Sequence, residues 1–303
     1  MTDPVRELVD RVRGTVQFDE PLARYTTYRI GGPAKALITP TSTEDVVEVL
    51  RFCDQAAVRW LPLGLGSNVL MSDDGFNGVI IRLGKGLDWV DEASDGQEVW
   101  RTGAGLPTPR LARATASAGL SGIHRLIGVP GTVGGGVVMN AGAHGQDFSQ
   151  TVMSIEVVKP DGGVKTIESH NIGWRYRETG LESAVVTAAS FKFSPGDPKE
   201  LKRDLLRHFH WRKKGTPFDR PCCGSVFRNP GGAEPRSAGQ LIDAAGLKGF
   251  QIGGAQVSTR HANYIVNVGM ATAGDVTAVI DAVRQRVLDE FALELRLEVK
   301  IIE

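Results

Sequence analysis

The sequence predicts an α+β protein built from two domains. It has 303 residues, of which 41% are hydrophobic and 23% are charged, so it is long enough to form two hydrophobic cores. Residues up to about 193 contain short apolar segments separated by turns, which is typical of strands, whereas longer helical patterns follow later. Two prolines and a glycine within residues 194–198 mark the expected domain boundary.

Three helices and several short strands are expected in the first domain. Residues 1–20 show a helical face of apolar side chains. A second helix starts at Ser42, where Asp45 three residues later resembles a capping box, and a third starts at Thr108 and ends at Gly119. The expected strands are residues 36–38, 60–63, 78–83, 98–102 and 183–193, together with a hairpin formed by residues 152–159 and 164–167.

Three further helices and a terminal strand are expected in the second domain. A charged helix spans residues 199–214, and a shorter helix spans residues 237–245. The last helix begins after Thr272, which forms a capping box with Asp275. Its apolar side chains fall on one stripe, formed by Val276, Val279, Ile280, Val283, Val287, Leu288 and Phe291. A strand at residues 295–302 ends the sequence.

Residues 125–145 form a glycine-rich apolar segment around which the sequence is organised. Glycine has no Cβ, so its backbone adopts positive φ values and approaches a ligand closely, and successive amides form an anion-binding concavity. A membrane helix is disfavoured because seven glycines, Pro130 and Asn140 interrupt the segment. A collagen-like segment or a linker is disfavoured because the glycines lack a three-residue period and are separated by large apolar residues. We therefore expect bare backbone beside a large bound cofactor.

A second glycine-rich turn, Gly-Leu-Gly-Ser-Asn at residues 64–68, follows an expected strand. A Rossmann turn would need a third glycine that opens a helix and an acidic residue about 20 positions later, and neither fits well here. Taken alone, the pattern favours an ordinary tight turn. Together with the first segment, it favours a pair of loops that hold a pyrophosphate through backbone amides, with Ser67 and Asn68 as additional donors.

Charge and cysteine content exclude several classes of function. Lys and Arg together number 35, as do Asp and Glu, so no global field favours nucleic acid or an anionic membrane. The three cysteines give neither a disulfide framework nor a metal-binding spacing, and the six histidines form no array of metal ligands. The N-terminus lacks the pattern of an export signal. We expect a cytoplasmic protein that binds no metal.

Two polar segments remain open to more than one interpretation. Ser225 follows a glycine, but Phe227 stands where a nucleophile elbow needs a second glycine, so the serine alone favours a structural turn. Cys223 has no partnered base in the sequence and favours a buried thiol. Residues 174–179 interleave cations and aromatics, which fits either a stacking surface for nucleic acid or a single guanidinium aimed at a substrate carboxylate.

These motifs together resemble the UDP-N-acetylenolpyruvoylglucosamine reductases, which are flavoproteins of bacterial cell-wall precursor synthesis. The resemblance extends over almost the whole sequence and fits the shorter subtype, which lacks an extra substrate-covering insertion. The segments that carry it are residues 26–33, 63–70, 128–145, 176–177, 224–230, 239–267 and 295–302.

The resemblance implies an FAD-binding fold of the vanillyl-alcohol-oxidase/PCMH type. This domain would span residues 1–195 as two α+β subdomains, about 1–85 and 86–195, and a smaller α+β substrate-binding domain would span residues 196–303. The terminal strand 295–302 would return to the active site. NADPH would deliver hydride to non-covalently bound FAD, and the enolpyruvyl ether of UDP-N-acetylglucosamine would then be reduced to UDP-N-acetylmuramate. A monomer is implied.

The resemblance also implies roles for individual residues. Arg177 would stabilise the charge that grows on the substrate carboxylate, Ser225 would donate a proton to carbon, and Glu298 would assist with a raised pKa or a contact to Arg177. Tyr176 and Asn229 would contact the substrate. The implied FAD-binding residues are Gly64, Leu65, Gly66, Ser67, Asn68, Gly128, Pro130, Gly131, Thr132, Gly134, Gly135, Asn140 and Ala141.

The sequence departs from the family pattern at two positions, and two rival functions stay open. Thr179 stands where the family usually has serine, and Glu303 stands where relatives place glycine and a tail. One rival is another flavoprotein of the same fold that oxidises a small alcohol or sugar, often with covalently attached flavin. The other is a non-catalytic protein that binds nucleotide sugars.

Overall fold

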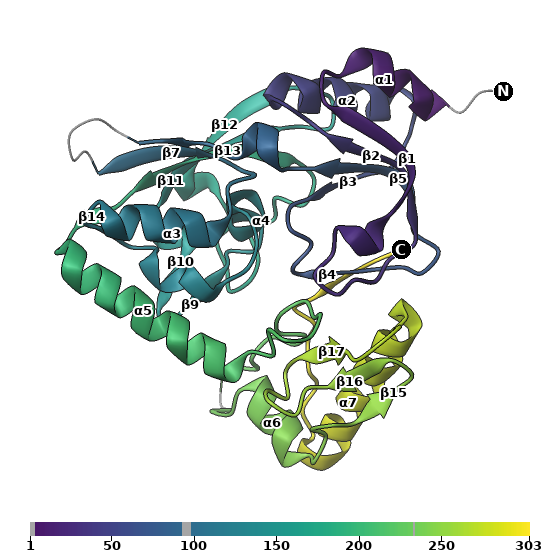
Figure 1. Ribbon diagram of the computed structural model, residues 1–303, viewed down its shortest axis with the longest axis vertical. Helices are drawn as coiled ribbons and strands as arrows, with labels where there is room; N and C mark the ends of the chain where they lie inside the picture. Colours follow the sequence, from purple (N-terminus) through teal and green to yellow (C-terminus); the bar gives the residue numbers. More distant parts are fainter. Residues whose placement is uncertain (1–3, 93–97, 233) are drawn as a thin grey trace. The chain divides into compact units, whose positions relative to one another are not determined.

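The computed structural model describes residues 4–92, 98–232 and 234–303 and contains two compact units (Figure 1). The first unit comprises Met1–Asp19, Ala34–Gly64 and Asn77–Trp211. The second unit comprises Glu20–Pro33, Leu65–Phe76 and Arg212–Glu303. The chain therefore crosses between the units several times, and one of these crossings lies inside the second glycine-rich turn, between Gly64 and Leu65.

A four-stranded sheet lies at the start of the chain. Its strand order is β1-β2-β5-β3, with β3 parallel to β5. The strands are β1 (Thr15–Pro21), β2 (Pro33–Thr39), β5 (Phe76–Arg82) and β3 (Trp60–Leu63). Helix α2 (Thr43–Gln55) buries Val46, Val49 and Leu50. The strands predicted at residues 36–38, 60–63 and 78–83 are confirmed, within a few residues at their ends.

Two predictions near the N-terminus need correction. The expected helix over residues 1–20 is only the short turn η1 (Pro4–Glu7) and α1 (Leu8–Arg11), because Thr15–Pro21 forms strand β1. Ser42 is the N-cap of α2, but its side chain makes no capping hydrogen bond. The Asp45 carboxylate instead accepts hydrogen bonds from the amides of Thr41, at 2.7 Å, and Arg13, at 2.8 Å.

A five-stranded antiparallel sheet forms the second layer of the first unit. Its order is β12-β11-β13-β7-β6, and the predicted hairpin is confirmed as the pairing of β11 with β12. The strands are β6 (Val90–Asp91), β7 (Val99–Gly103), β11 (Val152–Val158), β12 (Val164–Glu168) and β13 (Val185–Lys192). Phe148, Phe191, Phe193 and Trp100 are buried in the core of this unit. This sheet also packs against α4 (Val133–Val138), which belongs to the glycine-rich segment.

Helix α5 (Pro198–Gly215) lies along α3 (Thr108–Ser117) in the first unit (Figure 1). Leu201 and Leu205 of α5 are buried with Ala112, Ala116 and Ile127. Because these contacts fix most of α5 to the first unit, the division by compactness falls at Arg212 inside the helix. The assignment of cofactor binding to residues 1–195 and of substrate binding to residues 196–303 stays a prediction.

The second unit combines two helices with short strands. Helices α6 (Ala238–Ala244) and α7 (Ala273–Phe291) each begin with a capping box, and the α7 box joins Thr272 and Asp275 as predicted. The apolar stripe of α7 is buried except for Leu288, which is 43% exposed, and Phe291, which is partly buried. The predicted terminal strand is shorter than expected: only Lys300–Ile302 forms a strand, β18, which pairs in parallel with β4 (Val69–Met71).

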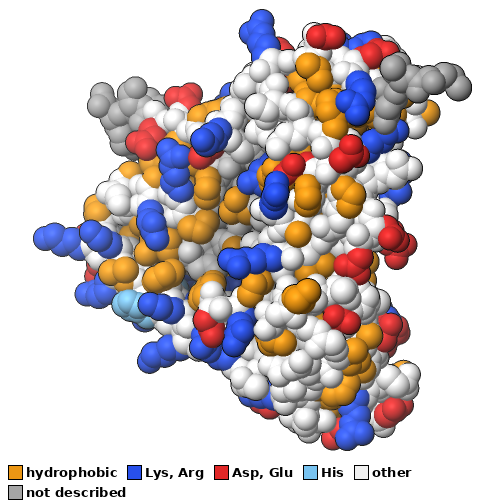
Figure 2. Space-filling view, turned by 45° about the vertical axis from the view of Figure 1, so that its right-hand side comes forward, with side chains coloured by type: hydrophobic (Ala, Val, Ile, Leu, Met, Phe, Trp, Pro, Cys, Tyr) orange, Lys and Arg blue, Asp and Glu red, His pale blue; other side chains and the backbone are white. Residues whose placement is uncertain are grey.

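The remaining strands are short. In the second unit, β15 (Gln251–Ile252), β16 (Ala255–Val257) and β17 (Ile265–Asn267) form an antiparallel sheet. In the first unit, β8 (Leu120–Ser121) pairs with β14 (Ser194–Pro195), and β9 (Gly142–Ala143) pairs with β10 (Gln146–Asp147). The 3-10 turns are η2 (Leu22–Arg24), η3 (Lys85–Leu87), η4 (His124–Gly128), η5 (Phe148–Gln150) and η6 (Ser169–Asn171). Basic, acidic and hydrophobic side chains are interspersed on the face of the molecule that Figure 2 shows. Among the described residues, no helix has both the length and the apolar character needed to cross a bilayer.

Candidate functional site

The glycine-rich segment forms η4, a turn and helix α4 in the first unit. Thr132 is the N-cap of α4, and its Oγ1 accepts a hydrogen bond from the Gly135 amide at 3.4 Å. A Cβ on Gly134 would lie 2.9 Å from the Cβ of Ala104, and a Cβ on Gly136 would lie 2.4 Å from the ring of Phe148. These two glycines are therefore required by packing inside the unit, whatever ligand the segment binds.

The two predicted glycine-rich stretches meet in the first unit. A Cβ on Gly64 would lie 2.5 Å from Oγ1 of Thr132, so only glycine allows the backbone at this position to approach so closely. The sequence predicted FAD-binding roles for both Gly64 and Thr132, and the structure adds that they lie side by side. This contact supports a shared role for the two stretches.

The second stretch continues as a tight turn in the second unit. Gly66 has φ +62°, and its carbonyl accepts a hydrogen bond from the Thr27 amide at 3.1 Å. A Cβ on Gly66 would lie 2.2 Å from the carbonyl oxygen of Tyr25. No described residue accepts a hydrogen bond from the amides of Leu65, Gly66 or Ser67. Successive amides whose N–H groups are not bonded within the protein suit an anion such as a pyrophosphate. These residues therefore fit the predicted dinucleotide cofactor.

Arg177 is held against the far end of the glycine-rich segment. Its guanidinium donates hydrogen bonds to the carbonyls of Gly142, at 2.7 Å, and Asn140, at 3.3 Å. The guanidinium carbon lies 4.9 Å from the ring centroid of Tyr176, which is 52% exposed. Arg177 itself has φ +60°, a conformation that non-glycine residues adopt at a cost in free energy. The fold thus brings Arg177 and Tyr176 to the predicted cofactor segment.

Two side chains near Arg177 are committed to internal hydrogen bonds. Asn140 Nδ2 donates to the Arg175 carbonyl, and Asn140 Oδ1 accepts from the Ser149 amide, each at 3.1 Å. Thr179 is buried and donates to the Val138 carbonyl at 2.7 Å. This bond needs only a hydroxyl, so threonine supplies the same donor as the serine that the resemblance implies at this position.

Ser225 and Glu298 come together in the second unit. The Glu298 amide donates to the Val226 carbonyl at 2.8 Å, and the Arg228 amide donates to the Arg296 carbonyl at 2.8 Å, so the two segments run side by side. Ser225 is half-buried, and its hydroxyl makes no hydrogen bond to another described residue. The fold therefore pairs the segments that carry two of the three predicted catalytic residues, whose catalytic roles stay predictions.

The second glycine-rich turn joins this pair. Asn68 Nδ2 donates to the Glu298 carbonyl at 3.1 Å, and the Lys300 amide donates to the Asn68 carbonyl at 3.0 Å. A Cβ on Gly224 would lie 3.8 Å from the Ser67 carbonyl oxygen. The predicted cofactor residues Ser67 and Asn68 thus lie beside the segments that carry Ser225 and Glu298.

Asn263 supports the Ser225 segment and was missed by sequence reasoning. Its buried side chain bonds both backbone groups of Phe227, accepting from the amide at 2.9 Å and donating to the carbonyl at 2.8 Å. Its own carbonyl accepts from the Val226 amide at 2.9 Å. A lone asparagine carries no sequence signal for such a role.

Asn229 Oδ1 accepts from the Ala238 amide at 3.1 Å, so this predicted substrate contact also holds the start of α6.

The cysteines have the properties of buried thiols. Burial raises the pKa of Cys53 to about 12 and raises the pKa of Cys223 well above its usual value. Cys223 is 1% exposed and adjoins Tyr28 in the core of the second unit. A thiol that stays protonated is a poor nucleophile, which agrees with the structural interpretation of Cys223.

Comparisons with known proteins identify both parts of the chain. Residues 34–168 match a family model described as an FAD binding domain, and residues 216–302 match the model of the UDP-N-acetylenolpyruvoylglucosamine reductase C-terminal domain. The reductase of Halalkalibacterium halodurans is 40% identical over 98% of this chain and 99% of its own length. The Bacillus subtilis reductase is 38% identical over 100% of this chain and 99% of its own length.

Solved structures agree with the sequence matches. The crystal structure of the Thermus caldophilus reductase has a TM-score of 0.80, is 33% identical, and covers 96% of this chain and 99% of its own. A Phl p 4 variant described as a glucose oxidase shares the fold alone, with a TM-score of 0.51 and 18% identity over 65% of this chain and 44% of its own. The predicted fold class, an FAD-binding fold of the vanillyl-alcohol-oxidase/PCMH type plus a smaller α+β domain, is confirmed. With 40% identity over nearly its full length, the chain belongs to the UDP-N-acetylenolpyruvoylglucosamine reductase family.

Proposed function

We propose that this chain is the NADPH-dependent flavoenzyme that reduces UDP-N-acetylglucosamine enolpyruvate to UDP-N-acetylmuramate for peptidoglycan synthesis. The observation that carries the proposal is the pairing of the Ser225 and Glu298 segments through Val226, in a chain with the full-length family match. This pairing supports the proposal because it brings the backbone of the segment that carries the proposed proton donor next to the segment that carries the proposed carboxylate, and Asn68 of the second glycine-rich turn donates to the Glu298 carbonyl.

FAD is held without a covalent bond by the two glycine-rich stretches. The amides of Leu65, Gly66 and Ser67 bind the pyrophosphate, and residues 128–141 line the cofactor with backbone in which five glycines carry no side chain. The individual contacts are those of the thirteen FAD-binding residues predicted above. When bound, FAD supplies the hydride chemistry, accepting hydride from NADPH and delivering it to the unsaturated carbon.

Arg177 stabilises the negative charge that develops on the substrate. Addition of hydride to the terminal carbon moves negative charge onto the neighbouring carbon and its carboxylate. The Arg177 guanidinium is permanently charged, and the neutral carbonyls that accept its hydrogen bonds do not cancel this charge, so it can stabilise that negative charge. The carbonyls of Asn140 and Gly142 orient this guanidinium in the first unit. Tyr176 positions the substrate.

Ser225 and Glu298 complete the reaction. Ser225 donates a proton to the carbanionic carbon, since a strongly basic carbon can take a proton even from a hydroxyl. Glu298 assists next to the developing enolate. Asn229 contacts the substrate. We further propose that the protein is cytoplasmic and monomeric. Size-exclusion chromatography with light scattering tests the monomeric state.

The first prediction concerns the purified protein. It should be yellow, and acid precipitation should release all the colour into the supernatant. Without substrate, NADPH should reduce only the bound flavin, and continued consumption of NADPH should require the enolpyruvyl substrate. Colour that stays in the pellet would favour a covalent flavin oxidase, and a protein that binds the nucleotide sugar without consuming NADPH would favour a binding protein. A preparation that stays colourless when offered FAD contradicts the proposal altogether.

The second prediction concerns Gly64→Ala. The added Cβ would lie 2.5 Å from Oγ1 of Thr132, a buried side chain that caps α4, so the two stretches must move apart. We expect the free energy of unfolding to fall by about 1–3 kcal/mol and the affinity for FAD to fall with it. Urea denaturation and quenching of flavin fluorescence measure the two effects. Gly215→Ala is the control, because no atom lies within 4 Å of its Cβ, and unchanged FAD binding by both variants would contradict this role of Gly64.

A further inference from the structure

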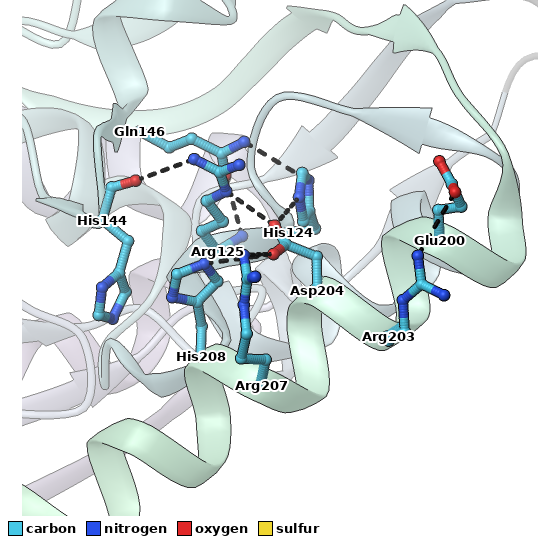
Figure 3. A network of polar contacts seen from close by, with 9 residues as sticks. All are labelled: His124, Arg125, His144, Gln146, Glu200, Arg203, Asp204, Arg207 and His208. Atoms are coloured by element: carbon cyan, nitrogen blue, oxygen red, sulfur yellow. Dashed lines mark hydrogen bonds and ion pairs between the residues drawn. The ribbon is translucent and has the colours of Figure 1, made fainter.

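Asp204 on α5 lies at the centre of a polar network in the first unit (Figure 3). One carboxylate oxygen accepts hydrogen bonds from Arg125 Nε, at 2.8 Å, and His124 Nε2, at 3.1 Å. The other oxygen contacts Arg207 and lies 3.4 Å from His208 Nε2. Burial opposes ionisation, but the hydrogen bonds from Arg125 and His124 lower the pKa of Asp204 to about 2. The carboxylate is therefore charged at any physiological pH.

The network continues from Arg125 to the hairpin formed by β9 and β10. The Arg125 amide donates to Gln146 Oε1 at 2.9 Å, and Arg125 Nη1 donates to the His144 carbonyl at 3.2 Å. The His144 ring lies 4.2 Å from the His208 ring of α5, measured between centroids. Figure 3 shows that these groups come from three separate stretches of chain and converge on Asp204.

His124 has one protonation state that satisfies all its neighbours. Burial lowers its pKa, so the ring is neutral at neutral pH. With the proton on Nε2 it donates to Asp204, and Nδ1 is left to accept from Gln146 Nε2 at 3.5 Å. Gln146 then points its oxygen at the Arg125 amide, which is the orientation observed. The four residues form one consistent set of donors and acceptors.

These contacts hold the glycine-rich segment at both ends. His124 and Arg125 open η4 at the start of the segment, and the β9–β10 hairpin lies at its end. Gly142 of this hairpin carries the carbonyl that accepts the 2.7 Å hydrogen bond from Arg177. Asp204 thus contacts His124 and Arg125 at the start of the segment directly, and these two residues in turn bond His144 and Gln146 of the hairpin whose Gly142 carbonyl binds Arg177.

We propose that Asp204 is a positioning residue that holds residues 128–142 in the shape that binds FAD and keeps the Arg177 guanidinium aimed at the substrate. The role rests on the proposed function, because it presupposes that this segment binds FAD. Asp204 touches neither cofactor nor substrate in this role; it acts through Arg125, His124 and the hairpin.

The test is Asp204→Asn, which removes the charge and keeps the shape. In the apoprotein, the Kd for FAD measured by quenching of flavin fluorescence should rise about tenfold, as expected when a charge-assisted hydrogen bond that orders a binding loop is weakened. In the FAD-saturated enzyme, kcat for substrate reduction should fall. A variant that loses urea stability but keeps the wild-type Kd would show a purely structural role and overturn the proposal.

Glu200→Gln is the matched control. Glu200 lies on the same helix about one turn earlier and pairs only with Arg203 at 3.4 Å, with both side chains largely exposed. Figure 3 shows this pair apart from the network. Its Kd for FAD and its kcat should equal those of the wild type. An equal change in both variants would assign the effect to helix charge in general and would overturn the proposal.

A second variant keeps the proposal testable if Asp204→Asn fails to fold. Gln146→Ala removes the hydrogen bond from the Arg125 amide and leaves Asp204 with its cations. It should raise the Kd for FAD in the same direction, and an unchanged Kd would count against the proposal. A wild-type protein that binds no FAD would instead refute the proposed function, so the two failures are distinguishable.

Discussion

Ser225→Ala should abolish most of the reduction of the enolpyruvyl substrate while leaving reduction of the flavin by NADPH intact. The hydroxyl is proposed to donate the proton to carbon, and loss of a positioned acid typically slows a step by about 10²–10⁴-fold. The structure favours this variant as a clean probe, because the Ser225 hydroxyl is committed to no other described residue. The segment itself is held by backbone hydrogen bonds and by Asn263, which the substitution leaves in place.

Rapid mixing experiments that follow the visible absorbance of the flavin separate the two half-reactions. Ser258→Ala is the matched control, because Ser258 is a buried serine of the same unit whose Oγ accepts hydrogen bonds from the Arg260 and His261 amides. It should lower the free energy of unfolding by about 1 kcal/mol and leave both half-reactions near their wild-type rates. Equal loss of both half-reactions in Ser225→Ala would return Ser225 to a structural role.

Arg177→Ala should lower both the rate of substrate reduction and the affinity for FAD. Removal of the charge that stabilises the developing enolate should slow substrate reduction by about 10²–10³-fold. The two hydrogen bonds to the Asn140 and Gly142 carbonyls are also lost, so the affinity for FAD should fall as well. Arg177→Lys should not rescue the rate, because a single ammonium cannot reproduce the planar fork that serves both carbonyls and a carboxylate.

Arg175→Ala provides the control for Arg177. The Arg175 side chain is 77% exposed and lies 3.8 Å from Glu178, and exposed pairs of this kind contribute little to stability. Its removal should change neither half-reaction nor the Kd for FAD. Substrate reduction by Arg177→Ala at the wild-type rate would contradict the catalytic role, whatever happens to FAD binding.

Local patterns in the sequence predicted several elements well. The last helix, with its Thr272–Asp275 capping box and its apolar stripe, and the hairpin of β11 and β12 formed where they were expected. Both depend on residues that are close in sequence, so a short window contains the necessary information. Strand β1 was predicted as part of a helix. It is an edge strand that forms by pairing with β2, and residues 15–21 alone do not reveal that pairing.

The extent of the elements at the domain boundary was decided by tertiary contacts. The prolines and glycine of residues 194–198 predicted a domain boundary there. Helix α5 begins at Pro198, but most of it stays with the first unit because Leu201 and Leu205 pack beside α3. The terminal strand narrowed to Lys300–Ile302 because only these residues find β4 as a partner. Before it, Leu297 forms only an isolated bridge with Phe227.

The sequence by itself determined the family, the fold class and the chemical identity of the candidate groups, because glycine, arginine and serine in fixed motifs carry that information locally. Only the tertiary structure decided that Gly64 packs against Thr132, that Asn263 supports the Ser225 segment and that Arg125 bonds both Asp204 of α5 and the His144 carbonyl. The physical reason is that each of these contacts joins residues far apart in the chain. A hydrogen bond or a steric fit between such residues exists only once the backbone has brought them within a few ångströms of each other.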